Sequence, residues 1–92
     1  MVERSVTVPN RLGLHARAAA RFVHVASRYQ SQIRVSRGSH TMDGKSIMGI
    51  LLLAAATGSV LKVCADGSDE VAALDALCAF IEGGFGEDTC SA

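Results

Sequence analysis

The first segment of the chain alternates between apolar and polar positions, which is the pattern of a strand with one buried face. Residues 2–8 read Val-Glu-Arg-Ser-Val-Thr-Val and are rich in β-branched side chains, which favour extended backbone. Pro9, Asn10 and Gly13 follow, and residues of these types favour a loop. We therefore expect a strand over residues 2–8 and then a loop.

Between residues 16 and 28 the apolar period changes to that of a helix. One apolar face repeats at i, i+3, i+4 and i+7 and contains Ala19, Phe22, Val23 and Ala26. A second stripe repeats at i, i+4, i+7 and i+11, is basic, and contains Arg17, Arg21, His24 and Arg28. A solvated helix face is the usual explanation of such a stripe, and a surface for a partner protein is the alternative. The histidine that precedes the helix favours the partner surface.

Two short strands and a second helix are expected in the middle of the chain. Residues 33–36 and 40–42 flank a glycine turn at 37–39, which predicts a hairpin. Ser46 stands at the N-cap position ahead of a helix over residues 47–54. A glycine inside this helix costs about 1 kcal/mol relative to alanine, so packing must hold the helix in place.

The last part of the chain predicts a strand and a third helix. Residues 57–59 favour a turn, and residues 60–64 favour a strand. Ser68 is the expected N-cap of the helix, and Asp69 and Glu70 lie in its first turn, where the helix dipole favours negative charge. The core face of this helix is expected to contain Leu74, Leu77, Cys78 and Ile81.

These elements define an α+β fold in the order β-α-β-β-α-β-α. Amphipathic helices over four strands imply an antiparallel or mixed sheet with the helices on one face. Gly83-Gly84 ends the third helix. We expect residues 1–84 to form a single domain and residues 85–92 to form a flexible C-terminal tail.

Composition places the chain among small globular domains. It has 92 residues, of which 49% are hydrophobic. The longest apolar run, over 47–56, is about half the roughly 20 residues that a membrane-spanning helix requires. The first residues lack the apolar block of a signal peptide. We therefore expect a cytoplasmic protein that does not contact a membrane.

No metal site is expected from the cysteines and histidines. The cysteines are odd in number and far apart, so a disulfide framework is not expected either. Cys64 and Cys78 are expected to be small buried residues, and Cys90 a free thiol in the tail. His24 and His40 lack the spacing of metal ligands and are expected at the surface.

The charges balance over the whole chain but are distributed unevenly. Residues 1–46 contain eight Lys or Arg and two Asp or Glu, whereas residues 47–92 contain one Lys and seven Asp or Glu. This asymmetry favours an acidic partner for the first half. Nucleic acid is disfavoured as that partner, because the chain has only four aromatic residues and they do not alternate with basic ones.

His15 is the strongest candidate for chemistry, because it directly precedes the first helix. The first N–H groups of a helix have no partners within it and stabilise an anion at the positive end of the dipole. A histidine is neutral in a large fraction at neutral pH, so a ring nitrogen can act as a nucleophile. A phosphoryl group on that nitrogen would meet these N–H groups and the guanidinium of Arg17. An isolated histidine at a helix start is more often a loop residue with no such role.

Two motifs in the chain favour the chemical role. Gly13-Leu14-His15-Ala16-Arg17 resembles the active-site signature of the histidine-containing phosphocarrier (HPr/NPr) family, and residues 44–51 resemble its second motif, around a regulatory serine. Residues 22–23 and 65–70 also resemble the family, so the likeness covers nearly the whole chain. It implies an open-faced β-sandwich with a four-stranded antiparallel sheet and three helices on one face.

The resemblance also implies a function and a set of partners. His15 would accept a phosphoryl group on its pros nitrogen from phosphorylated Enzyme I, of the sugar or the nitrogen type, and pass it to a histidine of an Enzyme IIA-type protein. Backbone groups of Ala16 and Arg17 would cradle the phosphate, and the Arg17 side chain would stabilise it. Ser46 would be a regulatory phosphorylation site for an HPr serine kinase/phosphorylase. Such a chain is a monomeric phosphoryl-transfer intermediate rather than a free-standing enzyme, and it requires no cofactor.

A docking surface is expected beside the nucleophile, because the family fold places the helix after Ser46 next to the histidine. Ile50, Leu53 and Ala54 suit a face of that helix directed at the core, and an exposed apolar patch beside a reactive group indicates partner binding. The expected partner-binding residues are Ala20, His24, Ile47, Met48 and Leu51.

One position departs from the pattern of the sugar-system members. Many of them have proline after the motif arginine, whereas Ala18 stands here. The run Ala18-Ala19-Ala20 and residues 85–88 are more similar to the nitrogen-system branch and related proteobacterial carriers. Alanine is compatible with a helix start, so the chemistry is intact and the choice between sugar uptake and nitrogen regulation stays open.

Two other functions are compatible with the same layout. The chain is alternatively a small non-enzymatic regulatory domain that binds a ligand and leaves His15 unphosphorylated. A hydrolase that uses His15 and Ser46 is disfavoured, because no motif places an acidic residue to orient the imidazole and no oxyanion signature is present.

Overall fold

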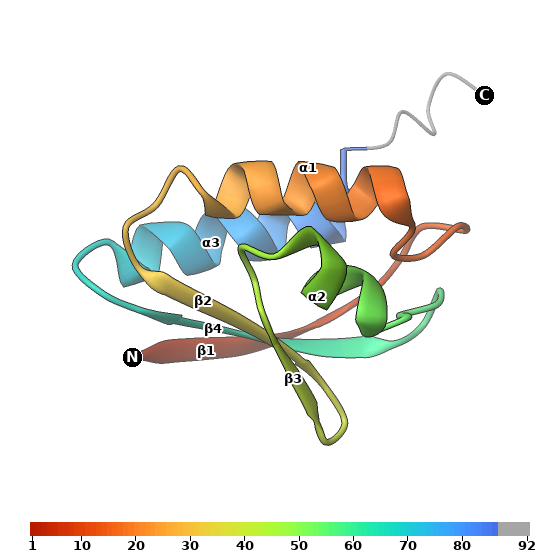
Figure 1. The fold of residues 1–92 in the computed structure, drawn as a ribbon, viewed down its shortest axis with the longest axis horizontal. Coiled ribbons are helices and arrows are strands. Elements are labelled where there is room, and N and C mark those ends of the chain that lie inside the picture. The colour runs from red at the N-terminus through yellow and green to blue at the C-terminus, as the bar shows by residue number, and fades with distance from the viewer. Residues whose placement is uncertain (87–92) are drawn as a thin grey trace.

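The computed structural model describes residues 1–86 of the chain, and the elements follow the expected β-α-β-β-α-β-α order (Figure 1). The elements are β1 (Val2–Thr7), α1 (Ala16–Ala26), β2 (Gln32–Arg37), β3 (His40–Asp43), α2 (Ile47–Leu52), β4 (Val60–Asp66) and α3 (Glu70–Glu82).

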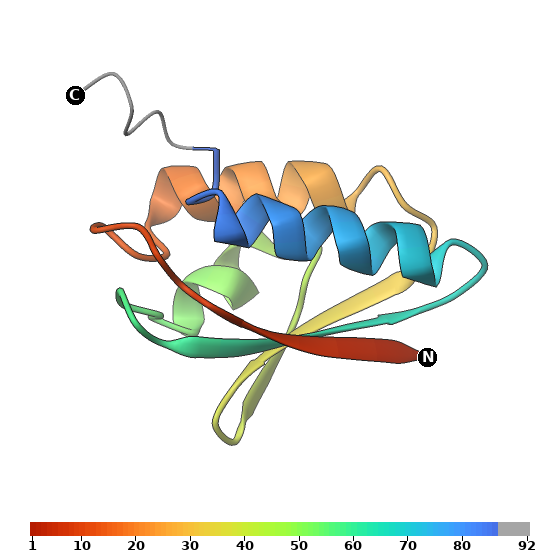
Figure 2. The same ribbon diagram turned by 180° about the vertical axis from the view of Figure 1, so that it is seen from behind.

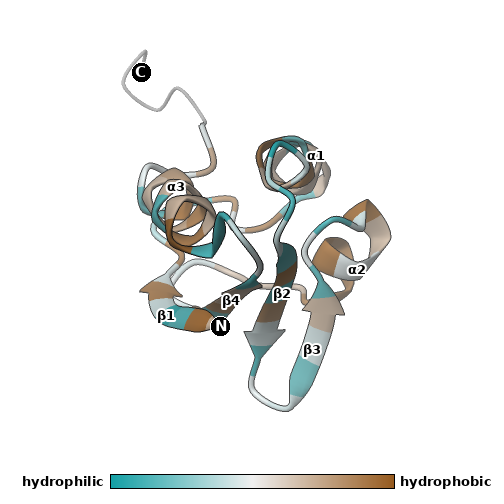
Figure 3. Cartoon of the chain, turned by 90° about the vertical axis from the view of Figure 1, so that its left-hand side faces the viewer, coloured by the Kyte–Doolittle hydropathy of each residue, from teal (hydrophilic) through white to brown (hydrophobic). Residues whose placement is uncertain are grey.

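The four strands form one antiparallel sheet in the order β1-β4-β2-β3. The long strand β4 lies between β1 and β2, with Val6 opposite Leu61 and Val35 opposite Val63 in the register. All three helices lie on one face of the sheet, and residues 1–86 leave the other face uncovered (Figure 3). The predicted class, an α+β open-faced sandwich, is therefore confirmed.

The core lies between the sheet and the helices. Alternate residues of β4, namely Leu61, Val63 and Ala65, are buried, whereas Val60 and Lys62 are exposed. This alternation follows from the two-residue period of a strand with one covered face. Cys78 is buried in the core as expected, whereas Cys64 is only partly buried. Cys90 lies outside the described residues.

Helix α1 is shorter than its apolar pattern predicts. It ends at Ala26 rather than at residue 28, and Ser27 is its C-cap, with its N–H donating to Val23 O at 2.8 Å. The chain then tightens into a turn in which the N–H of Tyr29 donates to Ala26 O. Lys45 Nζ donates to the carbonyl of Tyr29 at 2.7 Å, which ties this turn to the segment before α2.

Helix α2 also ends early, and one residue of its predicted core face is exposed. Ile50 and Leu53 are buried as expected, but Ala54 is exposed. The helix ends at Leu52, and Ala54 has a positive φ of 49°. A left-handed residue turns the chain away from the helix axis, so the 3.6-residue period no longer directs the Ala54 side chain to the core.

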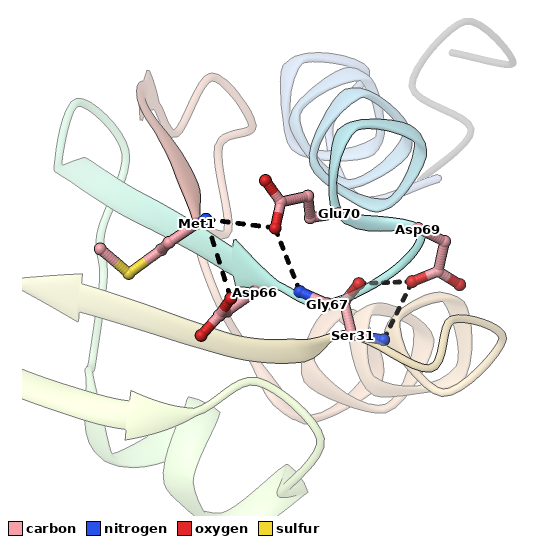
Figure 4. Close-up of polar contacts among 6 residues, drawn as sticks. All are labelled: Met1, Ser31, Asp66, Gly67, Asp69 and Glu70. Atoms are coloured by element: carbon pink, nitrogen blue, oxygen red, sulfur yellow. Dashed lines mark hydrogen bonds and ion pairs between the residues drawn. The ribbon is translucent and has the colours of Figure 1, made fainter.

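Helix α3 begins one residue later than predicted. Its N-cap is Asp69 rather than Ser68, and Asp69 makes no side-chain capping bond. Its carboxylate instead accepts a hydrogen bond from the Gln30 N–H at 2.9 Å. It also accepts from the Ser31 N–H at 2.9 Å and from the Ser31 hydroxyl (Figure 4). These hydrogen bonds, led by that from the Ser31 hydroxyl, hold the pKa of Asp69 below its usual value. Asp69 therefore joins α3 to the loop between α1 and β2.

Glu70 secures the loop that precedes α3. Its Oε1 atom accepts from the Gly67 N–H at 3.2 Å and lies 3.2 Å from the amino group of Met1 (Figure 4). The Gly67 hydrogen bond is the main cause of a lowered pKa at Glu70. Gly67 itself packs closely on Ser31, since a Cβ at this position would lie 2.7 Å from Ser31 Cα.

The packed domain extends past the boundary predicted at residue 84. Phe85, expected in the flexible tail, is fully buried, and its ring meets that of Phe80 edge-to-face at 6.1 Å between centroids. Its N–H donates to Phe80 O at 2.9 Å. The glycine pair predicts the end of the helix but not the destination of the next side chain. The remainder of the predicted tail, residues 87–92, lies outside the described residues.

Candidate functional site

His15 occupies the N-cap position of α1. Its backbone is extended, with φ −101° and ψ −178°, and its carbonyl accepts the N–H of Ala19 at 2.8 Å. The N–H groups of the first helical turn, from Ala16 to Ala18, have no acceptor one turn earlier within the helix. Ala16 and Arg17 are exposed, and the His15 side chain is partly exposed. The predicted combination of a histidine, a helix N-terminus and an arginine is therefore present at the surface.

The loop before His15 is fixed by its own hydrogen bonds. Asn10 Nδ2 donates to Gly13 O at 2.9 Å, and the Gly13 N–H donates to Asn10 O at 3.2 Å. The side chains of Asn10 and Leu14 are buried. A buried neighbour on its N-terminal side and a helix on its C-terminal side define the position of His15.

The segment after α2 braces the same loop from the other side. The N–H of Leu14 donates to Ala55 O at 2.8 Å, and Thr57 Oγ1 donates to Arg11 O at 2.9 Å and to Asn10 O. Nearby, the N–H of Gly58 donates to Val8 O at 2.8 Å. This bracing is not visible in the sequence, because the two segments are more than 40 residues apart.

Gly13 is required at the closest point of this contact. Its φ is +66°, and a Cβ there would lie 2.5 Å from Ala55 O and 3.0 Å from Ala56 Cα. Both neighbouring atoms are backbone, so neither can move without shifting the chain. The glycine of the histidine motif thus allows the loop to approach the segment after α2.

Ser46 caps α2, as predicted. Its Oγ accepts the N–H of Gly49 at 3.1 Å, which satisfies one of the free donors of the helix. A Cβ at Gly49 would lie 3.3 Å from that same Oγ and 3.4 Å from Met42 Cβ. The glycine inside the helix therefore leaves room for the capping hydroxyl and for β3.

Helix α2 is rich in apolar residues and lies next to α1 (Figure 3). Ile47 is 46% exposed and Met48 is 67% exposed, whereas Leu51 is half-buried and packs against the core. Leu52, which is not among the predicted partner-binding residues, is 63% exposed. The spacing of Leu52 from Met48 indicates its exposure, because residues four apart lie on the same face of a helix.

Helix α1 contributes the polar part of the surface. Arg17, His24 and Arg28 of the predicted basic stripe are exposed, and so is Ala20. Arg21 is partly buried, and its Nη1 atom donates to the carbonyl of Gly86 at 3.0 Å. A basic face on α1 and an apolar face on α2 thus adjoin the end of the molecule that carries His15.

The structure supports neither a metal centre nor a membrane span within residues 1–86. In this part of the chain, no three His, Cys, Asp or Glu side chains are grouped to hold a metal ion. No helix here has the length and hydrophobicity to cross a bilayer.

An α+β open-faced sandwich with a histidine at a helix N-terminus defines the class of histidine phosphocarrier domains, and comparison with known proteins agrees. The model of the PTS HPr component phosphorylation site matches residues 2–83. The chain is 47% identical to phosphocarrier protein HPr of Cupriavidus necator, over 95% of this chain and 98% of that protein. It is 38% identical to phosphocarrier protein NPr of Shewanella violacea, over 94% of each. The chain belongs to the HPr family of phosphotransferase-system phosphocarriers.

A solved structure confirms the fold. The crystal structure of HPr-C-His from Thermoanaerobacter tengcongensis superposes with a TM-score of 0.90 at 45% sequence identity, covering 96% of this chain and 99% of that one. The resemblance predicted from the two motifs is therefore confirmed in both sequence and fold.

Proposed function

We propose that the chain accepts a phosphoryl group on the pros nitrogen of His15 from phosphorylated Enzyme I and passes it to a histidine of an Enzyme IIA-type protein. The observation that carries the proposal is the position of His15 at the N-cap of α1 in a member of the HPr family. There the imidazole adjoins N–H groups without helical partners and the exposed Arg17.

The transfer is a displacement at phosphorus. The lone pair of the His15 nitrogen forms the new N–P bond, the bond from phosphorus to the donor group breaks, and its electron pair remains with the donor. No proton needs to leave the attacking nitrogen, because the neutral ring carries its proton on the other nitrogen. The reverse displacement, with the acceptor histidine as nucleophile, returns His15 to its starting state.

Helix α1 supports the phosphorylated state of His15. The phosphoryl oxygens carry negative charge, and the backbone N–H groups of Ala16 and Arg17 lie at the positive end of the helix dipole. The Arg17 guanidinium supplies a charge-assisted donor. These contacts stabilise the phosphohistidine only moderately, which suits a carrier that must also release the group.

The basic face of α1 and the apolar face of α2 form the proposed docking surface. The exposed Ala20 and His24 supply one part, and Ile47, Met48 and Leu51 supply the other. Apolar contacts at the centre of such a surface provide affinity, and the surrounding positive charge guides an acidic partner into place. The exposed Leu52 extends this surface.

Ser46 is the proposed regulatory site for an HPr serine kinase/phosphorylase. A phosphate there would add about −1.5 to −2 charges at the N-terminus of α2. That charge would lie beside Ile47 and Met48, where docking of Enzyme I removes water. Phosphorylation of Ser46 would therefore oppose docking through the cost of desolvation and through repulsion of an acidic partner.

The relatives include HPr and NPr proteins, so sugar uptake and nitrogen regulation are both proposed contexts for the transfer. We further propose that the carrier acts as a cytoplasmic monomer, because Enzyme I and Enzyme IIA-type proteins must reach His15 in turn.

The decisive experiment is phosphorylation with phosphoenolpyruvate and a matching Enzyme I, followed by intact-mass measurement under alkaline conditions, since phosphohistidine is labile in acid. Wild type should gain one phosphoryl group. His15→Ala should fold normally and gain none, and His24→Ala should still gain one. If wild type stays unmodified, the ligand-binding alternative is favoured, and if His15→Ala is labelled, the acceptor is another residue.

A further inference from the structure

The segment that leads from α2 into β4 lies beside the loop between β1 and α1 (Figures 1 and 2). Thr57, an exposed residue of this segment, directs its hydroxyl at two consecutive carbonyls of the loop. Its Oγ1 donates to Arg11 O at 2.9 Å and to Asn10 O. A hydroxyl carries one proton, so the two carbonyls share it in a three-centred hydrogen bond. Thr57 is therefore attached to the loop that precedes His15.

The two carbonyls belong to the turn that leads the chain to His15. The N–H of Gly13 donates to Asn10 O at 3.2 Å, so this oxygen accepts both the hydrogen bond that closes the turn and the Thr57 hydroxyl. A carbonyl oxygen has two lone pairs and can accept both. Leu14 alone separates the turn from His15. A displacement of the turn is therefore transmitted to the histidine.

Thr57 is itself held by the sheet. The N–H of Gly58 donates to Val8 O at 2.8 Å, and the N–H of Val8 donates to Ser59 O at 2.8 Å. These two hydrogen bonds continue the pairing of β1 with β4 past the end of β1. The Thr57 hydroxyl thus connects a well-anchored part of the domain to the turn.

The turn has a second attachment at its other end. The N–H of Leu14 donates to Ala55 O at 2.8 Å. One attachment fixes a point of the chain, whereas two attachments on either side of Gly13 also fix the direction in which the chain enters α1. The Thr57 hydroxyl supplies the attachment that sets this direction.

We propose that Thr57 is a positioning residue for phosphoryl transfer at His15, which rests on the proposed function of that histidine. Its hydroxyl holds residues 10–13 so that the reacting ring nitrogen stays in line with the phosphorus of the partner. Reacting atoms must lie about 3–3.5 Å apart and aligned, and a displacement of about 1 Å can slow a reaction by about 100-fold. Thr57 takes no part in the bond changes and acts through the backbone that it holds.

Transfer kinetics with the intact carrier test the hydroxyl. Thr57→Val replaces it by a methyl group of similar size, and Thr57→Ser retains it. With phosphorylated Enzyme I as the donor, Thr57→Val should lower the limiting transfer rate by about 10- to 100-fold. The half-saturating concentration of the carrier should stay unchanged, because the proposed docking residues on α1 and α2 are intact. Thr57→Ser should recover most of the wild-type rate.

Matched measurements isolate the positioning effect. Thr41→Val is the control for loss of a threonine hydroxyl, because Thr41 pairs with Ser36 on the sheet at 2.9 Å, and its transfer rate should equal that of wild type. Transfer from His15 to an Enzyme IIA-type protein should be slowed in Thr57→Val as well, since alignment matters in both directions. Phosphoramidate, a small donor that approaches histidine from any direction, should phosphorylate wild type and Thr57→Val at equal rates.

The motion of the turn gives a readout without any partner. In ¹⁵N relaxation-dispersion experiments, the amides of residues 11–14 in Thr57→Val should show exchange on the microsecond-to-millisecond timescale, and those of α2 should match wild type. The melting temperature should stay close to that of wild type, because an exposed hydrogen bond contributes little to stability. A melting temperature far below wild type would make Thr57 a structural residue and overturn the proposal.

The kinetic outcomes are equally decisive. Equal limiting rates for Thr57→Val and wild type would overturn the proposal, and so would a defect that Thr57→Ser does not repair. A raised half-saturating concentration at an unchanged limiting rate would assign Thr57 to docking instead. Equal slowing with phosphoramidate and with Enzyme I would show that the hydroxyl alters the reactivity of the nitrogen and not its alignment. If Enzyme I leaves wild type unmodified, the proposed function fails and the positioning role fails with it.

Discussion

The N–H of Leu14 donates to the carbonyl of Ala55 at 2.8 Å. This hydrogen bond joins the residue before His15 to the segment that leaves α2, so the histidine motif contacts the segment that follows the second motif. The position of the proposed nucleophile therefore depends on α2 and the turn after it, and not only on the local loop.

Gly13→Ala tests this contact. The substitution places a methyl group on a residue with φ +66° and within 2.5 Å of Ala55 O. A left-handed alanine alone costs about 1–2 kcal/mol. Gly38→Ala is the matched control, because its φ is +61° but nothing lies within 4 Å of the added Cβ. We expect Gly13→Ala to lower the free energy of unfolding more than the control in denaturant titrations, and to slow phosphorylation of His15. If both variants lose the same free energy of unfolding, the backbone around Ala55 accommodates the added methyl group without cost.

Arg17→Gln tests the proposed phosphate contact. A charge-assisted hydrogen bond contributes about 1.5–3 kcal/mol, so the loss should slow transfer by about 10- to 150-fold. The fold should be unaffected because Arg17 is exposed on α1. Arg34→Gln removes another exposed arginine, from β2, and serves as the control for net charge. Transfer rates from Enzyme I, measured by rapid quench, should separate the two variants. Wild-type rates for Arg17→Gln would make Arg17 an ordinary solvated residue.

Met48→Glu and Leu52→Glu test the docking surface. Each places a negative charge in an exposed apolar position, which should weaken binding to Enzyme I by at least tenfold without unfolding the protein. Val71→Glu makes the same change at a position of similar exposure on α3, outside the proposed surface. Titration calorimetry measures the affinities, and circular dichroism checks the fold. If all three variants bind equally well, α2 is not the docking site.

Ser46 variants separate the structural role from the regulatory one. Ser46→Ala removes the acceptor of the Gly49 N–H and should cost about 1 kcal/mol of stability. Ser46→Asp retains an N-cap acceptor and should keep the melting temperature, yet slow phosphorylation of His15. Transfer rates at two ionic strengths should show a smaller defect for Ser46→Asp at high salt. Equal rates for Ser46→Asp and wild type would confine Ser46 to capping.

Asp69 should give the protein a specific acid sensitivity. Its carboxylate is stabilised by Ser31 and Gln30, and its pKa in the folded state lies below the usual value. A lowered folded pKa means that the contribution to stability is complete above the unfolded pKa and is lost as pH falls through the folded pKa. Asp69→Ala should therefore lower the melting temperature at neutral pH, and the difference from wild type should shrink below about pH 4. A difference that stays constant down to pH 2 would contradict this assignment.

The sequence by itself determined the features that depend on near neighbours. The two-residue alternation of residues 2–8 defines β1, and the spacing of Ala19, Phe22 and Ala26 defines the buried face of α1. The Ser46 cap is likewise a contact across three residues. The motif around His15 indicated the family, because histidine, helix start and arginine are adjacent in the chain. Local patterns of this kind are visible in sequence, since the period of each element fixes which side chains share a face.

The tertiary structure decided which distant segments meet. Leu14 lies against Ala55, Asp69 binds the backbone of Ser31, and Phe85 fills the core beside Phe80. In the sequence, Asp69 is a typical residue of a first helical turn, and Phe85 follows two glycines that end a helix. Their roles arise from partners that the packing of α3 on α1 and the sheet brings close, and no local period encodes such pairings. The physical reason is that burial and hydrogen bonding act between neighbours in space, and the fold alone determines which residues those are.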